Sequence, residues 1–137
     1  VRGIDHPKSG FFQRTTQTIT VVDKAHPITQ GLGDSFQIVD EAYNCPIFED
    51  AVHPLLRTDF TPKDVSANLS PRAKFSNLAA WVKTAENSPI VYIQLGHDRQ
   101  AWENPACRTL LDNAIRWAAS PDAIAWAKKN PKRIFKN

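Results

Sequence analysis

The sequence predicts a single domain of the α/β class. Before residue 96, short runs of β-branched residues alternate with polar ones, which is the period of a strand. After residue 104, apolar residues instead recur every three or four positions, which is the period of a helix. The chain has 137 residues, of which 42% are hydrophobic, so it is long enough to bury one sizeable core. We therefore expect one domain over residues 1–137, with strands first and helices last.

Five strands are expected from these patterns. Residues 17–22 (QTITVV) and 36–44 (FQIVDEAYN) alternate, and residues 53–60 (HPLLRTDF) are a third candidate. Residues 77–85 (NLAAWVKTA) and 89–95 (PIVYIQL) are expected to pair as an antiparallel hairpin, with a loop longer than the tightest turns between them.

Two loops separate the strands. Residues 23–35 contain a His-Pro pair and two glycines, which interrupt regular structure. Residues 61–74 are rich in Pro, Ser and Asn, and we expect an irregular excursion there.

Two helices end the chain. The first covers residues 104–119, with Asn104 as its N-cap and Pro105 at its first helical position. The second covers residues 121–129, with Ser120 as its cap and lysines near its C-terminus, where the helix dipole favours positive charge. We expect the apolar faces of both helices to pack against the sheet.

Charge and hydropathy exclude two classes of partner. The net charge of +3 becomes about −2 when the five positive charges of the basic tail, residues 128–137, are set aside, so we expect no nucleic-acid binding. No apolar run approaches the roughly 20 residues that cross a bilayer, so we expect a soluble chain without a membrane span. The sequence lacks methionine even at position 1, and we expect that something has been lost from its N-terminus.

The cysteines and histidines indicate no cofactor by themselves. Cys45 and Cys107 lack CxxC spacing, which leaves two buried thiols, one disulfide or one reactive thiol. The four histidines show no HxH or HExxH spacing, so we assign no metal ligands, although histidines and acids from distant positions could still assemble a metal site.

The stretch IVYIQLGHDRQAW, residues 90–102, carries the first candidate site residues. An apolar strand stops at Gly96, which allows a positive φ or a close approach to a ligand, and His97 and Asp98 follow directly. Ligands of open α/β sheets bind outside the carboxyl ends of the strands, so His97 is a candidate for proton transfer there. The alternative is a histidine that only caps its turn through a backbone hydrogen bond.

Four motifs, in this order, resemble the ThuA-like (trehalose utilisation) family. They are HPITQGL at residues 26–32, DEAY at 40–43, LGH at 95–97 and the closing RTLLDNAIRWA at 108–118. The opening DHPKSGFFQ, with His6, is similar to a His-Pro region of that family. The resemblance implies a flavodoxin-like three-layer fold with a parallel sheet, related to the class I glutamine amidotransferases. Because such domains are longer and begin with strand-helix units, this chain resembles the C-terminal part of one. We expect an incomplete sheet whose open edge is covered by a missing N-terminal segment or by a second copy.

These stretches, together with the resemblance, supply the expected site residues. His97 and Glu41 are the expected catalytic residues, and Tyr43, Asp40, Asp98, Trp102 and His6 are expected to bind substrate. Two acids at the end of an apolar strand are costly unless they are paired or solvated, and a solvated strand end is the alternative for Asp40 and Glu41. Trp102 could equally be a wall for a sugar ring or an anchor for the helix that follows.

The implied function lies in carbohydrate catabolism. The chain would bind or transform a sugar or keto-sugar by hydrolysis, elimination or isomerisation; the alternative is a non-catalytic module that binds carbohydrate or a protein. Glutaminase chemistry is not expected, because neither Cys45 nor Cys107 lies in a strand-to-helix elbow. We expect a bacterial protein, located in either the cytoplasm or the periplasm.

Overall fold

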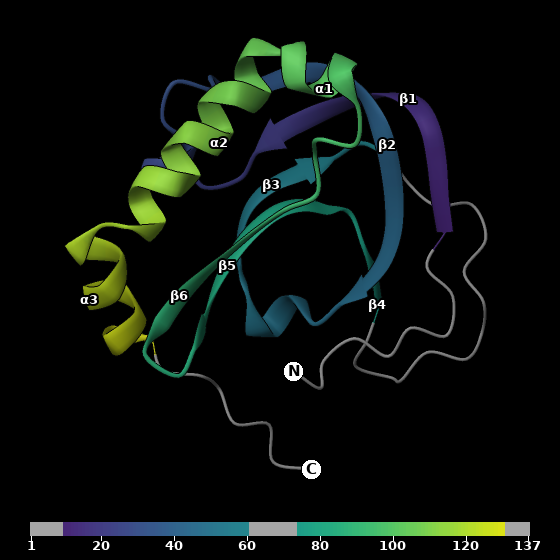
Figure 1. The fold of residues 1–137 in the computed structure, drawn as a ribbon. Coiled ribbons are helices and arrows are strands. Elements are labelled where there is room, and N and C mark those ends of the chain that lie inside the picture. The colour runs from purple at the N-terminus through teal and green to yellow at the C-terminus, as the bar shows by residue number, and fades with distance from the viewer. Residues whose placement is uncertain (1–9, 61–73, 131–137) are drawn as a thin grey trace.

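The protein folds into a curved sheet with three helices. The computed structural model describes residues 10–60 and 74–130. The elements are, in order, β1 (Gly10–Val21), η1 (Pro27–Thr29), β2 (Ser35–Ile47), η2 (Glu49–Ala51), β3 (His53–Thr58), β4 (Lys74–Ser76), β5 (Leu78–Ala85), β6 (Ser88–Ile93), α1 (Arg99–Glu103), α2 (Pro105–Ala118) and α3 (Pro121–Lys129). The three helices lie along one side of the strongly curved sheet (Figure 1). The expected α/β class is therefore confirmed.

The sheet itself corrects the expectation of a parallel, flavodoxin-like arrangement. Its six strands lie in the order β4-β2-β1-β3-β5-β6, and every one of these neighbouring pairs is antiparallel. Parallel neighbours need a crossover of about a dozen residues or more, usually a helix. Here the α-helices of the described residues all follow the last strand, so no α-helix is available to carry such a crossover.

The hairpin of β5 and β6 is confirmed, but its loop is shorter than expected. Ala85 pairs with Ser88, so only Glu86 and Asn87 turn the chain. Glu86 has a φ of 54°, which suits a tight turn of the kind that joins twisted antiparallel strands. A two-residue turn admits only antiparallel pairing.

The two longer helices begin where the sequence predicts. The Asn104 side chain accepts hydrogen bonds from the amides of Ala106 and Cys107, and that of Ser120 accepts one from Ala123. The short helix α1 is an addition, because five residues are too few to show a helical period.

The core lies between the sheet and α2. Ile19, Leu56, Ala80 and Val82 of the strands are buried, as is Leu110 of the helix. Trp117 of α2 contacts the ring of His26, beside η1, at a centroid distance of 4.9 Å. These contacts fix the helix layer on the sheet.

Strands β1 and β2 form the longest ribbon, and this ribbon carries the site. The strand expected at residues 17–22 begins at Gly10 instead. The register shifts between Phe12 and Thr15, where Arg14 has a φ of 50°. Such a bulge sharpens the local twist and bend, and bulges are common beside functional sites.

Some expectations lie outside the described residues. Of the irregular segment 61–74, only residue 74 is described, and of the basic tail only residues 128–130. His6 lies outside the described residues. Among the described helices, none has the length and apolar character that crossing a bilayer requires.

Candidate functional site

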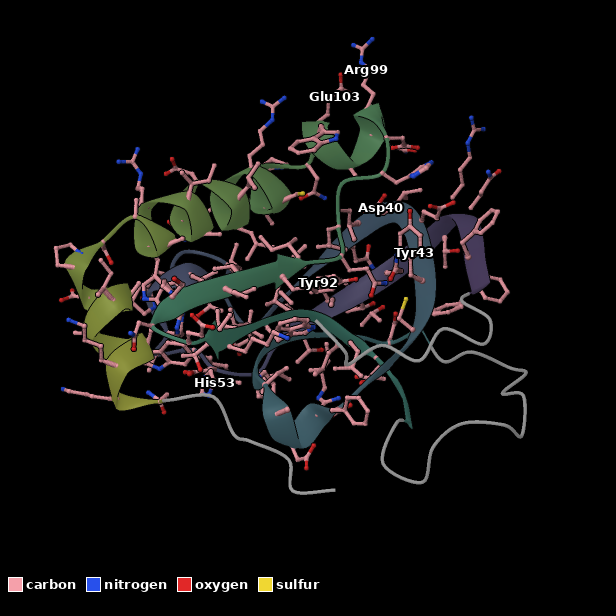
Figure 2. The ribbon with its side chains drawn as sticks, turned by 60° about the horizontal axis from the view of Figure 1, so that its bottom comes forward. Asp40, Tyr43, His53, Tyr92, Arg99 and Glu103 are labelled. Carbon is pink, nitrogen blue, oxygen red and sulfur yellow. The ribbon has the colours of Figure 1, made fainter. Side chains whose placement is uncertain are left out.

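The candidate site forms where β2 meets the segment between β6 and α1. Asp40 is fully buried, and its two carboxylate oxygens accept three backbone N–H groups. Oδ2 accepts from Gly96 at 2.7 Å, and Oδ1 accepts from His97 at 3.1 Å and from Glu41 at 2.8 Å. Asp40 and Tyr43 lie together on the curved part of β2 (Figure 2).

Asp40 therefore fixes the backbone that carries His97. A buried carboxylate is costly unless it is hydrogen-bonded, and here both of its oxygens are occupied. This arrangement differs from the solvated strand end considered above, and it makes Asp40 a residue that positions His97. The Gly-His turn is thus capped by an acid from another strand, and the His97 ring is free for a different partner.

That partner is Glu41. Nδ1 of His97 lies 3.0 Å from Oε2 of Glu41, whose side chain is only 5% exposed, whereas the His97 side chain is 46% exposed. A neutral histidine with Nδ1–H donating to a carboxylate has an unprotonated Nε2, which can accept a proton. No hydrogen bond or ion pair of Nε2 is found among the described residues. Glu41 and His97 thus form a carboxylate-imidazole pair with its acid buried and its base partly exposed.

Tyr43 completes this cluster. Its hydroxyl lies 3.3 Å from Nδ1 of His97. A hydrogen bond to Glu41, together with burial and the charge of Glu41, raises the pKa of Tyr43 to about 12. A tyrosine is already protonated at neutral pH, and the raised pKa reflects a phenol that donates to the carboxylate, which helps to hold Glu41 towards His97.

Gly96 and Trp102 form the other flank of His97. Gly96 has a φ of 116°, and a Cβ added there would lie 3.2 Å from Cζ2 of Trp102. The indole therefore packs on the glycine, which any other residue would disturb. The Trp102 side chain nevertheless remains 45% exposed, so packing on the turn leaves much of the residue open to solvent.

Asp98 has a structural role in these contacts. Its side chain accepts hydrogen bonds from the amides of Gln100 and Ala101 and so caps α1. The structure thus brings together His97, Glu41, Tyr43 and Asp40 and places Trp102 beside them, whereas Asp98 turns to the helix and His6 lies outside the described residues.

A second carboxylate-imidazole pair lies elsewhere. Nε2 of His53 is 2.7 Å from Oδ2 of Asp23, and Figure 2 shows His53 far from Tyr43. Beside this pair, Nδ1 of His26 accepts the amide of Ile28, as expected for a histidine that stiffens its loop, and burial lowers the pKa of His26. This cluster holds the loop after β1 rather than joining the site.

Metal and thiol chemistry find no support in the described residues. Across residues 10–60 and 74–130, no group of three His, Cys, Asp or Glu side chains is arranged to hold a metal ion. Cys45 in β2 and Cys107 in α2 are both free thiols, and burial raises the pKa of each. Of the three alternatives for the cysteines, a disulfide is excluded.

Two features of the site were missed from the sequence. One is the positioning role of Asp40, for which an acid within an alternating apolar strand was the only signal. The other is the pairing of Phe11 with Tyr43 in the ribbon, because the start of β1 was expected seven residues too late. The aromatic pair in GFFQ was the available signal.

Comparison with known proteins places the chain in a family. No curated protein matches the chain. The sequence profile of the family described as "ThuA: Trehalose utilisation" matches residues 2–118, which include all the residues of the candidate site. The matched span covers most of the 137 residues, and the description is a carbohydrate-related one. The chain belongs to the ThuA family.

Proposed function

We propose that the protein binds a sugar or keto-sugar at the cluster of His97, Glu41 and Tyr43 and transfers a proton through Nε2 of His97. The observation that carries the proposal is the 3.0 Å contact between Nδ1 of His97 and the buried Glu41 carboxylate. The family description supports the class of ligand.

The chemistry follows from this pair. A buried carboxylate that accepts Nδ1–H orients the imidazole and stabilises the imidazolium that forms when Nε2 takes up a proton. Histidine is the side chain that most often acts as a general acid or base in enzymes. Tyr43 helps to hold Glu41 in place by donating its phenol O–H to the carboxylate.

The acids at the site favour proton abstraction over direct glycoside hydrolysis. Most glycosidases use two available carboxyl groups on either side of the scissile bond. Here Asp40 is occupied by three amides and Glu41 by His97 and Tyr43. Within the described part of the chain, the cluster contains no second carboxylate free for that task.

A keto-sugar offers a proton that a single base can remove. Nε2 of His97 would take the proton from the carbon next to the ketone, and the electron pair of that C–H bond would form an enolate. In an elimination, the enolate expels the neighbouring glycosidic oxygen, which takes the proton from the imidazolium. In an isomerisation, the proton returns to a different atom of the enediolate. Both reactions share their first step.

Deuterium exchange tests that step directly. The protein is incubated in D₂O with trehalose that has been oxidised to a ketone at one ring hydroxyl, and NMR follows deuterium entering the position next to the carbonyl. His97→Ala should slow the exchange about a hundredfold or more, the usual scale for a general base. Glu41→Gln keeps the shape of its side chain and removes its charge, so it should also slow exchange.

His53→Ala is the matched control, because it breaks the other carboxylate-imidazole pair far from the site. It should exchange like the wild type. If His97→Ala is folded and exchanges at the wild-type rate, the proposal is wrong. Binding of the keto-sugar by the wild type without any exchange or turnover would instead indicate a non-catalytic carbohydrate-binding module.

A further inference from the structure

An exposed aromatic residue stands next to the cluster of His97, Glu41 and Tyr43. Phe11 is 60% exposed and lies directly opposite Tyr43 in the antiparallel register of β1 and β2. Residues opposite one another in such a pair have side chains on the same face, with Cβ atoms about 4.5–5.5 Å apart. The hydroxyl of Tyr43 in turn reaches His97. Phe11 is therefore a direct neighbour of Tyr43, a member of the cluster, and lies on the same face of the ribbon.

The neighbouring phenylalanine shows that this placement depends on the register. Phe12 is also exposed, at 45%, but it lies opposite the buried Ala42 and so on the other face of the ribbon. Its ring packs against Phe60 at a centroid distance of 5.0 Å. No ring contact is found for Phe11 among the described residues. The two adjacent aromatic side chains thus have different surroundings.

Single exposed apolar side chains are common on protein surfaces and need no explanation by themselves. Phe11 differs because it pairs with Tyr43, and the hydroxyl of Tyr43 contacts His97. Trp102, packed on Gly96 and 45% exposed, brings a second open aromatic side chain close to the same histidine. Exposed aromatic side chains from the ribbon and from α1 thus lie next to residues of the cluster or of its turn.

We propose that Phe11 is a substrate-binding residue that stacks against the C–H face of a pyranose ring held at His97. This inference rests on the proposed function and deepens it by assigning the residue that recognises the ring. A pyranose has faces made of C–H groups and a rim of hydroxyls, and an aromatic side chain without polar atoms suits the faces and not the rim. Because the ring of Phe11 does not reach the reacting atoms, it contributes to binding and not to the proton transfer itself.

The test separates binding from chemistry and uses two ligands, trehalose and its keto-sugar. Dissociation constants are measured by NMR titration, and KM and kcat by the turnover or exchange of the keto-sugar. Phe11→Ala should weaken binding and raise KM about tenfold, because an aromatic contact is commonly worth about that factor in affinity. The kcat should stay close to that of the wild type. Phe11→Tyr, which retains the ring, should restore the affinity.

Phe12→Ala is the matched control, since it removes an exposed ring from the adjacent position on the opposite face. It should leave affinity and KM unchanged. If Phe11→Ala binds as tightly as the wild type, or loses no more affinity than Phe12→Ala, the assignment of Phe11 is refuted while the role of His97 stands. If the wild type binds neither ligand, the proposed function is refuted and this inference with it.

Discussion

Replacing Asp40 by Asn should both destabilise the fold and disable the site. Asp40 is fully buried and accepts three backbone N–H groups, which makes it the link between β2 and the turn that carries His97. An asparagine can still accept the backbone amides of Glu41 and His97 through its Oδ1. Its NH₂ group then faces the amide of Gly96, where Oδ2 accepted at 2.7 Å, so two donors oppose each other.

The magnitude follows from the lost bond. A hydrogen bond to a charged group contributes about 1.5–3 kcal/mol, and a buried donor without a partner costs about 1–3 kcal/mol. Because the neighbouring backbone can relax in part, we expect a loss of about 3 kcal/mol in the free energy of unfolding. For a domain of this size that corresponds to a Tm about 10 °C lower. The rate of deuterium exchange per folded molecule should also fall, because His97 would no longer be held in place.

Urea unfolding and thermal melting followed by circular dichroism measure the stability. Asp98→Asn is the control, because it makes the same chemical change at a partly exposed helix cap, where Asn and Asp are nearly equivalent. The control should melt within a few degrees of the wild type. If Asp40→Asn melts with the control and exchanges at the wild-type rate, the buried carboxylate does not hold the turn and the reasoning is wrong.

Two further predictions concern groups outside the site. Burial lowers the pKa of His26 below its unfolded value of 6.5, so the unfolded chain binds more protons and stability is lost as the pH falls below about 6.5. His26→Asn keeps an acceptor for the amide of Ile28 but cannot titrate. A plot of Tm against pH between 7 and 5 should therefore be flatter for the variant than for the wild type. An equal slope would contradict this prediction. Burial raises the pKa of both thiols, so a double variant with Cys45→Ser and Cys107→Ala should exchange deuterium at the wild-type rate per folded molecule. A loss of exchange in a double variant that is still folded would show that a thiol takes part in the chemistry.

The sequence by itself determined the local elements and the class of the fold. Asn104 and Ser120 cap the two helices where their spacing to proline predicts, because capping depends only on residues within one turn. The hairpin of β5 and β6 was also predicted, since alternation and turn residues are local signals. The resemblance of short motifs to the ThuA family was confirmed, and with it a relation to carbohydrate utilisation.

Only the tertiary structure decided how these elements meet. The antiparallel order of the sheet was not predicted, because periodicity reports which side of a strand is buried and not which strand lies beside it. Asp40 and Gly96 are 56 positions apart, and the bonds between them depend on how the curved ribbon meets the turn. On this strand, Asp40 binds the backbone of Gly96 and His97, whereas Glu41 binds the ring of His97. The sequence of two adjacent acids could not reveal these two roles. Their separation arises because neighbouring residues of a strand face opposite sides, and only the surrounding fold decides what each side meets.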